Sequence, residues 1–177
     1  MSTVIDGSAS VTINSGAVLG ITSGTAVAST SGTSIDFTGI PSWVKRITVM
    51  FNGVSTSGTS KILVQLGSTT FTTTGYLGAA NQTVNGSGVT GAVNSAGFFL
   101  DDTASASAIR YGNIVLTLIT GNTWVESATI ARSDTSAVSI SSGSIALSGT
   151  LDRVRITTVG SPPTDTFDAG SINILYE

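Results

Sequence analysis

The stretch Arg46-Ile47-Thr48-Val49-Met50-Phe51-Asn52-Gly53 decides the fold class of this chain. Every second residue from Ile47 to Phe51 is apolar, which is the period-two pattern of a half-buried β-strand. The Asn52-Gly53 pair that follows is a turn signal. We therefore expect a strand over residues 46–52 that ends in a tight turn.

The same alternation recurs along most of the chain, together with many β-branched residues, and helical spacing is not sustained. Turn signals separate the apolar runs at roughly the spacing of 8–12 residues that is typical of a β-sandwich or jelly roll. The sequence therefore predicts an all-β fold, a jelly-roll-like β-sandwich over residues 33–177. The region 75–97 is the longest without a predicted strand. Strands are predicted over 33–37, 46–52, 61–67, 69–73, 96–100, 113–120, 123–132, 144–147, 153–158 and 169–177.

The composition excludes several kinds of chemistry. Of 177 residues, 40% are hydrophobic and only 10% are charged, and the chain contains no Cys and no His. Without Cys there is no disulfide framework and no thiol nucleophile. Without His the commonest general base and the commonest metal ligand are missing. We expect no catalytic residues, no cofactor and no metal site.

The charge distribution bears on the partners of the chain. Seven basic residues are scattered along a chain with a net charge of −3, so we expect no nucleic-acid binding. No apolar run approaches the ~20 residues that span a membrane, so we expect no membrane insertion. The first ten residues lack the pattern of a secretory signal, which favours synthesis in a cytoplasm without export by the general pathway. Because so few charges protect the strand edges, we also expect a symmetric homo-oligomer.

Residues 1–32 form a segment of a different character, in which short apolar bursts alternate with Gly and Ser. Each burst is too small to form a core, and an isolated hairpin is marginally stable. One interpretation is a flexible linker. The regular placement of Val11, Ile13, Val18 and Ile21 favours another, an extended N-terminal arm that becomes ordered against partner chains. We take these four residues as candidates for assembly and anchoring.

The carboxylates are candidate catalytic residues, because two of them suffice for glycoside hydrolysis. Asp101 and Asp102 are adjacent, so they point in opposite directions in an extended chain. Asp165 and Asp168 follow a Pro-Pro pair in a predicted loop. Because Asp favours turns, we interpret these groups as turn caps or solvated loop residues. The full set is Asp101, Asp102, Glu126, Asp134, Asp152, Asp165 and Asp168.

The aromatic residues divide into core residues and one candidate for ligand binding. Trp43 and Trp124 are predicted to pack at the ends of sheets. Tyr76 lies in the Gly-Tyr-Leu-Gly loop of the strandless region, where an exposed aromatic ring provides a platform for sugars. Tyr76 is therefore the candidate for ligand binding.

Three stretches of the chain resemble segments of tailed-bacteriophage virion structural proteins. One is TSIDFTGIPSWVKRITVMFNGVS over residues 33–55; the others are LDRVRITT over 151–158 and DTFDAGSINILYE over 165–177. The resemblance extends over roughly residues 30–177. It implies a jelly-roll-like domain, trimeric and displayed outward, as at the ends of tail fibres and in other virion appendages, and it carries no catalytic residues.

Two functional hypotheses follow. The first is a non-enzymatic virion protein, a head-decoration protein or a short fibre, anchored by residues 1–32 to capsid or tail proteins. The second is a carbohydrate-binding module that acts as an adhesin on host-surface polysaccharide. A glycan hydrolase that uses two carboxylates is a weaker third.

Overall fold

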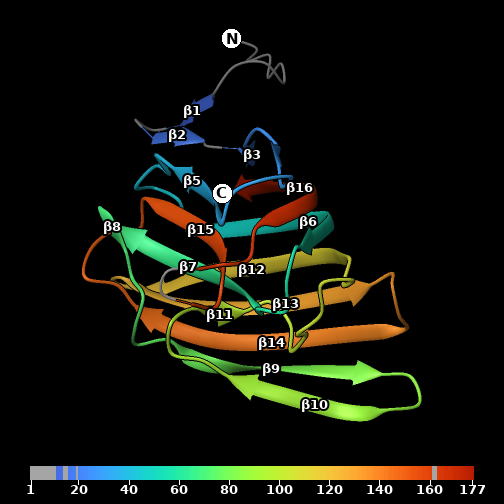
Figure 1. The fold of residues 1–177 in the computed structure, drawn as a ribbon. Helices are drawn as coiled ribbons and strands as arrows, with labels where there is room; N and C mark the ends of the chain where they lie inside the picture. The colour runs from blue at the N-terminus through green and yellow to red at the C-terminus, as the bar shows by residue number, and fades with distance from the viewer. Residues whose placement is uncertain (1–10, 14–15, 19, 161–162) are drawn as a thin grey trace.

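The computed structural model describes residues 11–13, 16–18, 20–160 and 163–177, and this part of the chain contains β-strands and no helix (Figure 1). The strands are β1 (Val11–Ile13), β2 (Gly16–Val18), β3 (Thr22–Ser23), β4 (Val27–Ala28), β5 (Ser34–Thr38), β6 (Arg46–Thr56), β7 (Ile62–Ser68), β8 (Thr70–Phe71), β9 (Leu77–Val84), β10 (Gly88–Val93), β11 (Phe98–Phe99), β12 (Arg110–Thr120), β13 (Thr123–Arg132), β14 (Ala137–Ala146), β15 (Arg153–Thr158) and β16 (Phe167–Tyr176).

Two antiparallel sheets pack against each other. The nine-stranded sheet has the order β10-β9-β14-β13-β12-β6-β16-β3, with β4 also paired to β16. The five-stranded sheet has the order β11-β7-β15-β5, with β8 paired to β7. The predicted all-β sandwich class is confirmed, whereas the jelly-roll-like connectivity stays a prediction.

The core lies between the two sheets and follows the period-two pattern. In β6 the side chains of Ile47, Val49 and Phe51 are buried, as the alternation predicts. They share one apolar cluster with Val64 of β7 and Ile156 of β15, which come from the opposite sheet. Burial of these apolar faces is the main source of stability for a sandwich of this kind.

The predicted turn at Asn52-Gly53 is wrong, because β6 continues through it to Thr56. Gly53 instead lies at an irregular point in the pairing of β6 with β16, opposite Gly170. Both glycines have positive φ values, 69° and 92°, and a Cβ at Gly170 would lie 2.4 Å from the carbonyl oxygen of Gly53. The glycine that suggested a turn therefore allows a β-bulge, where the chain needs a conformation that other residues rarely adopt.

The prediction of a strandless region over 75–97 is also wrong. β9 and β10 form a hairpin there, and β9 pairs with β14 along most of its length. The residues of this hairpin are mostly Gly, Ala, Thr and Asn, so they give little contrast between the two faces. Pairing with β14 imposes the strand, and the sequence pattern carries little sign of it.

The N-terminal segment consists of two parts. Among the described residues, β1 and β2 pair only with each other. β3 and β4, which we assigned to the arm, pair with β16, and the buried Ser29 donates a hydrogen bond from Oγ to the carbonyl oxygen of Ala169 (2.8 Å). Figure 1 shows the β1–β2 hairpin beyond one end of the sandwich, with β10 at the other end.

Candidate functional site

The four candidate anchor residues lie at the β1–β2 end of the molecule. Val11, Ile13 and Val18 belong to β1 and β2, and their side chains lie outside the described part of the structure. Ile21 is 64% exposed and lines a hollow with Met50 of β6. The exposure of Ile21 leaves its side chain accessible to another chain, and its role in anchoring stays a prediction.

Tyr76 is buried, so the prediction of an exposed aromatic platform is wrong. Its side chain is 2% exposed, and its ring meets the edge of Phe98 at 4.8 Å between centroids and 89° between planes. Its hydroxyl accepts a hydrogen bond from the backbone N–H of Leu66 (2.7 Å) and donates one to the carbonyl of Thr72 (3.1 Å). Burial raises the pKa of this phenol well above its usual value. Tyr76 therefore acts as a structural residue between the sheets.

We predict that Tyr76→Phe lowers the free energy of unfolding by about 1–2 kcal/mol, because the buried N–H of Leu66 loses its acceptor. Tyr111→Phe is the matched control, since Tyr111 is 40% exposed. It should change stability by less than ~0.5 kcal/mol. Urea unfolding of both variants measures the difference, and equal effects would contradict the structural role of the Tyr76 hydroxyl.

The two tryptophans pack as predicted. Trp124 is 2% exposed and belongs to the core cluster. Trp43 is partly buried and packs on Tyr176, with 5.9 Å between ring centroids. Both rings therefore serve packing near the ends of strands.

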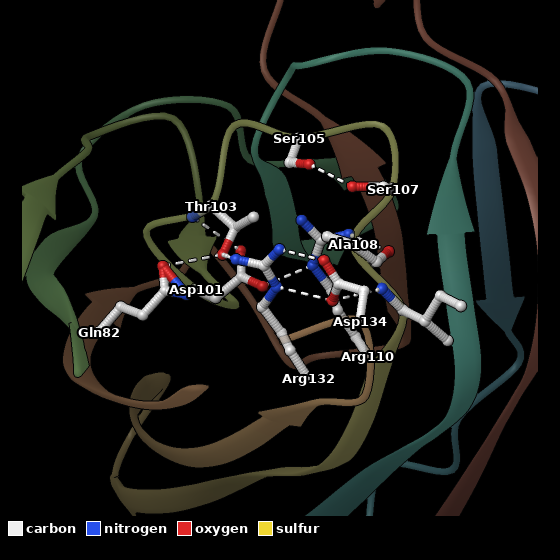
Figure 2. A network of polar contacts seen from close by, with 10 residues as sticks. Gln82, Asp101, Thr103, Ser105, Ser107, Ala108, Arg110, Arg132 and Asp134 are labelled. Atoms are coloured by element: carbon white, nitrogen blue, oxygen red, sulfur yellow. Dashed lines mark hydrogen bonds and ion pairs between the residues drawn. The ribbon is translucent and has the colours of Figure 1, made fainter. Parts of the chain in front are cut away.

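The candidate carboxylates each have a separate local partner. Asp101 and Asp102 turn to different cations, Arg110 and Lys61, as their adjacency predicts. The partners of the others are Arg132 for Asp134, Arg153 for Asp152, the backbone N–H of Ser60 for Asp165 and the hydroxyl of Ser55 for Asp168. In the described residues no group of three or more acidic side chains could hold a metal ion. These contacts connect segments of the fold, and two of the carboxylates share one network: Arg132, the partner of Asp134, also donates to the hydroxyl of Thr103 (3.5 Å), whose N–H binds Asp101 (Figure 2).

The most enclosed polar group is the pair of Arg110 and Asp101, whose side chains are both 0% exposed (Figure 2). The carboxylate of Asp101 also accepts the backbone N–H of Thr103 (3.2 Å). The hydroxyl of Thr103 donates to Gln82 (3.0 Å), which connects the pair to β9. One guanidinium nitrogen of Arg110, Nη2, and the amide nitrogen of Gln82 have no partner in the described structure. Arg110 was expected to be one of the scattered basic residues, and no sequence pattern pointed to this pair.

Glu126 is a second buried acid. It was one of the candidate carboxylates of the sequence, but its burial was not predicted. It is 4% exposed, and within the described part of the chain its carboxylate accepts a hydrogen bond from the hydroxyl of Ser141 alone (2.7 Å). Burial raises its pKa to about 7, and the hydrogen bond from Ser141 opposes that rise. It faces a small cavity lined by Gly78, Ala79, Asn94, Gly97, Phe98, Phe99, Ser141 and Ser142, none of which titrates. The enclosure of Glu126 therefore couples its protonation to the stability of the fold.

The outer face of the nine-stranded sheet, on the side away from the core, carries exposed apolar side chains. We define this outer face by the residues that alternate with the buried ones on β9, β12, β13 and β14, together with Val89, Gly91 and Val93 of β10, which pair with β9 residues of that face. None of these residues is charged. The exposed apolar residues on it are Leu77, Val89, Val93, Tyr111, Ile119, Val138 and Ile140. Such a face is typical of an interaction surface.

None of the seven basic residues lies on this outer face. Six of the seven basic residues lie in ion pairs with acidic partners. Two of them, Arg153 and Arg155, also lie over the ring of Phe71. These basic side chains contact groups within the fold, and they add no charge to the outer face that would disfavour binding of another protein there.

Comparisons with protein-family models, curated proteins and solved structures gave no match. In the described part of the chain no helix has the length and apolar character needed to cross a membrane.

Proposed function

We propose that this chain is a non-enzymatic structural protein of a tailed-phage virion, a head-decoration protein or a short fibre. Its N-terminal arm attaches it to capsid or tail proteins, and its sandwich projects outward. The resemblance of residues 33–55, 151–158 and 165–177 to virion proteins supports the class. The observation that carries the attachment is the β1–β2 hairpin, whose strands pair only with each other among the described residues.

An isolated two-stranded hairpin is marginally stable in water, so a partner surface would stabilise β1 and β2. Strands β3 and β4 fix the base of the arm to β16 at the edge of the sandwich. This geometry suits an anchor that is held firmly at its base and completes its pairing on another protein. The same arm would join copies of the chain into the proposed trimer.

The carbohydrate-binding alternative loses the residue on which it rested, because the ring of Tyr76 is buried. Host adhesion by another part of the surface is not favoured by a specific contact. We therefore propose the structural role alone.

The proposal predicts that deletion of residues 1–20 abolishes attachment to particles. This deletion removes β1 and β2 and leaves β3, β4 and the sandwich in place. Co-sedimentation with purified particles that lack the protein measures attachment, and thermal unfolding of the truncated chain is the control for folding. We expect attachment to fall at least ~10-fold with little change in the unfolding temperature. Undiminished binding by the truncated chain would overturn the anchor role.

A further inference from the structure

Strand β10 is the outermost strand of the nine-stranded sheet, at the end opposite the β1–β2 hairpin (Figure 1). It pairs only with β9, in an unbroken register from Gly88↔Val84 to Val93↔Ala79. In an antiparallel strand every second residue directs its N–H and C=O groups away from its neighbour. Five of the six residues of β10 are exposed, so this row of backbone groups faces solvent.

The edge of β10 lacks the features by which proteins protect such strands. Charged residues, Pro and bulges prevent edges from pairing with other chains. β10 has none of these, and residues 66–100 contain no charged residue at all. In the described sandwich, the other edge strands differ. β3, β4, β8 and β11 have two residues each, and β5 carries Asp36 in an ion pair with Arg155.

The sequence of β10 complements itself in the antiparallel direction. If two copies meet about a two-fold axis through Gly91, Val89 of each copy lies opposite Val93 of the other, and Thr90 lies opposite Ala92. Val89 and Val93 are 68% and 76% exposed on the outer face. Cross-strand pairs of β-branched side chains stabilise a sheet, and an uncharged seam brings no like charges together. A second copy of β10 therefore satisfies both the backbone and the exposed valines.

We propose that β10 is a homotypic edge, through which two copies of the chain join their nine-stranded sheets into one continuous antiparallel sheet. This contact is separate from the arm of the proposed function, since the two lie at opposite ends of the sandwich. It goes beyond that function by assigning a second interface, with its register, to residues outside the arm.

The test uses the full-length chain and two double variants of equal charge. In Val89→Lys/Val93→Lys the introduced ammonium groups lie opposite each other across the two-fold axis, which disfavours pairing. In Val138→Lys/Ile140→Lys the same charges lie on the outer face of β14, which is an inner strand of the sheet. Molar mass is measured by light scattering, with circular dichroism as the control for folding. We expect the edge variant to have half the molar mass of the unmodified chain, and the β14 variant to keep it.

A third variant tests the register. Val89→Lys/Val93→Asp places opposite charges across the proposed axis, so it should restore the molar mass of the unmodified chain. Three results would overturn the proposal: an unchanged mass in the edge variant, an equal loss of mass in the β14 variant, or no recovery in the charge-swapped variant. In a chain that lacks residues 1–20, the edge variant should still halve the molar mass. Failure of the anchor and failure of the edge contact are therefore distinguishable.

Discussion

Replacement of Arg110 by Met should lower the free energy of unfolding by about 3–5 kcal/mol, the usual effect of removing one partner from a buried ion pair. Arg110 and Asp101 are both fully buried, and Arg110 is the cation that contacts this carboxylate. Once the guanidinium is lost, Asp101 keeps the backbone N–H of Thr103 but no longer has a cation in direct contact. The folded state must then bury an unpaired charge or take up a proton.

Urea unfolding at neutral pH measures this effect, with Arg46→Met as the matched control. Arg46 also pairs with an acid, Glu177, but its side chain is 54% exposed. Its replacement should change stability by less than ~1 kcal/mol, because solvent screens an exposed pair. A loss in Arg110→Met no larger than the loss in the control would contradict the central role of the buried pair.

The double variant Arg110→Met/Asp101→Asn separates the value of the pair from the cost of breaking it. The neutral amide can still accept the N–H of Thr103, and no charge remains buried. Because Nη2 of Arg110 already lacks a partner, the native pair is incompletely satisfied. We therefore expect the double variant to regain most of the lost stability, as is common when a buried pair is replaced as a unit.

The sequence predicted best where side chains differ most between the two faces of a strand. β15 has the predicted bounds, 153–158, because Val154 and Ile156 alternate there with two arginines. β13 also has the predicted bounds, 123–132, and its buried face begins with the large ring of Trp124. β9 and β10 were missed because small residues occupy both faces; β9 takes its strand geometry from pairing with β14, and β10 from pairing with β9. That long-range partner cannot be read from a local window.

The residues of the candidate sites were harder to place than the strands. Tyr76 was expected to be exposed because it lies in a glycine-flanked loop. In the fold its ring packs against Phe98, and its hydroxyl accepts a hydrogen bond from the backbone N–H of Leu66. Arg110 resembled the scattered surface cations, since composition does not show which charge faces the core. The available signal was its position: Arg110 has the same parity along β12 as Ile114 and Leu116, whose side chains are buried.

The exposed edge at β10 could not be predicted from the sequence, because it depends on the long-range order of the strands. The sequence shows an uncharged region over 66–100, but an uncharged region becomes an exposed edge only through the order of strands in the sheet. The low charge of the whole chain led us to expect an oligomer. The sheet order adds the place where one contact between copies would form.

Glu126 should make the protein lose stability as the pH rises from about 4.5 to about 7. In the unfolded chain this carboxyl ionises near its ordinary value of 4.5, whereas burial raises its pKa to about 7 in the folded protein. Between these values the folded state holds a proton that the unfolded state has released, so the free energy of unfolding falls as the pH increases. The loss should total about 3 kcal/mol and should level off above pH 7, where both states are ionised.

Glu126→Gln provides the test, because its amide keeps the shape and the acceptor for the hydroxyl of Ser141 but does not titrate. Unfolding free energies of both proteins are measured from pH 4 to pH 9. The variant should match the native protein within ~1 kcal/mol near pH 4 and exceed it by about 3 kcal/mol at pH 8. No other titratable side chain lines the cavity that Glu126 faces, so the difference between the two curves reports this carboxyl. A constant difference across the range would contradict this prediction, because it would show that Glu126 has the same pKa in the folded and the unfolded protein.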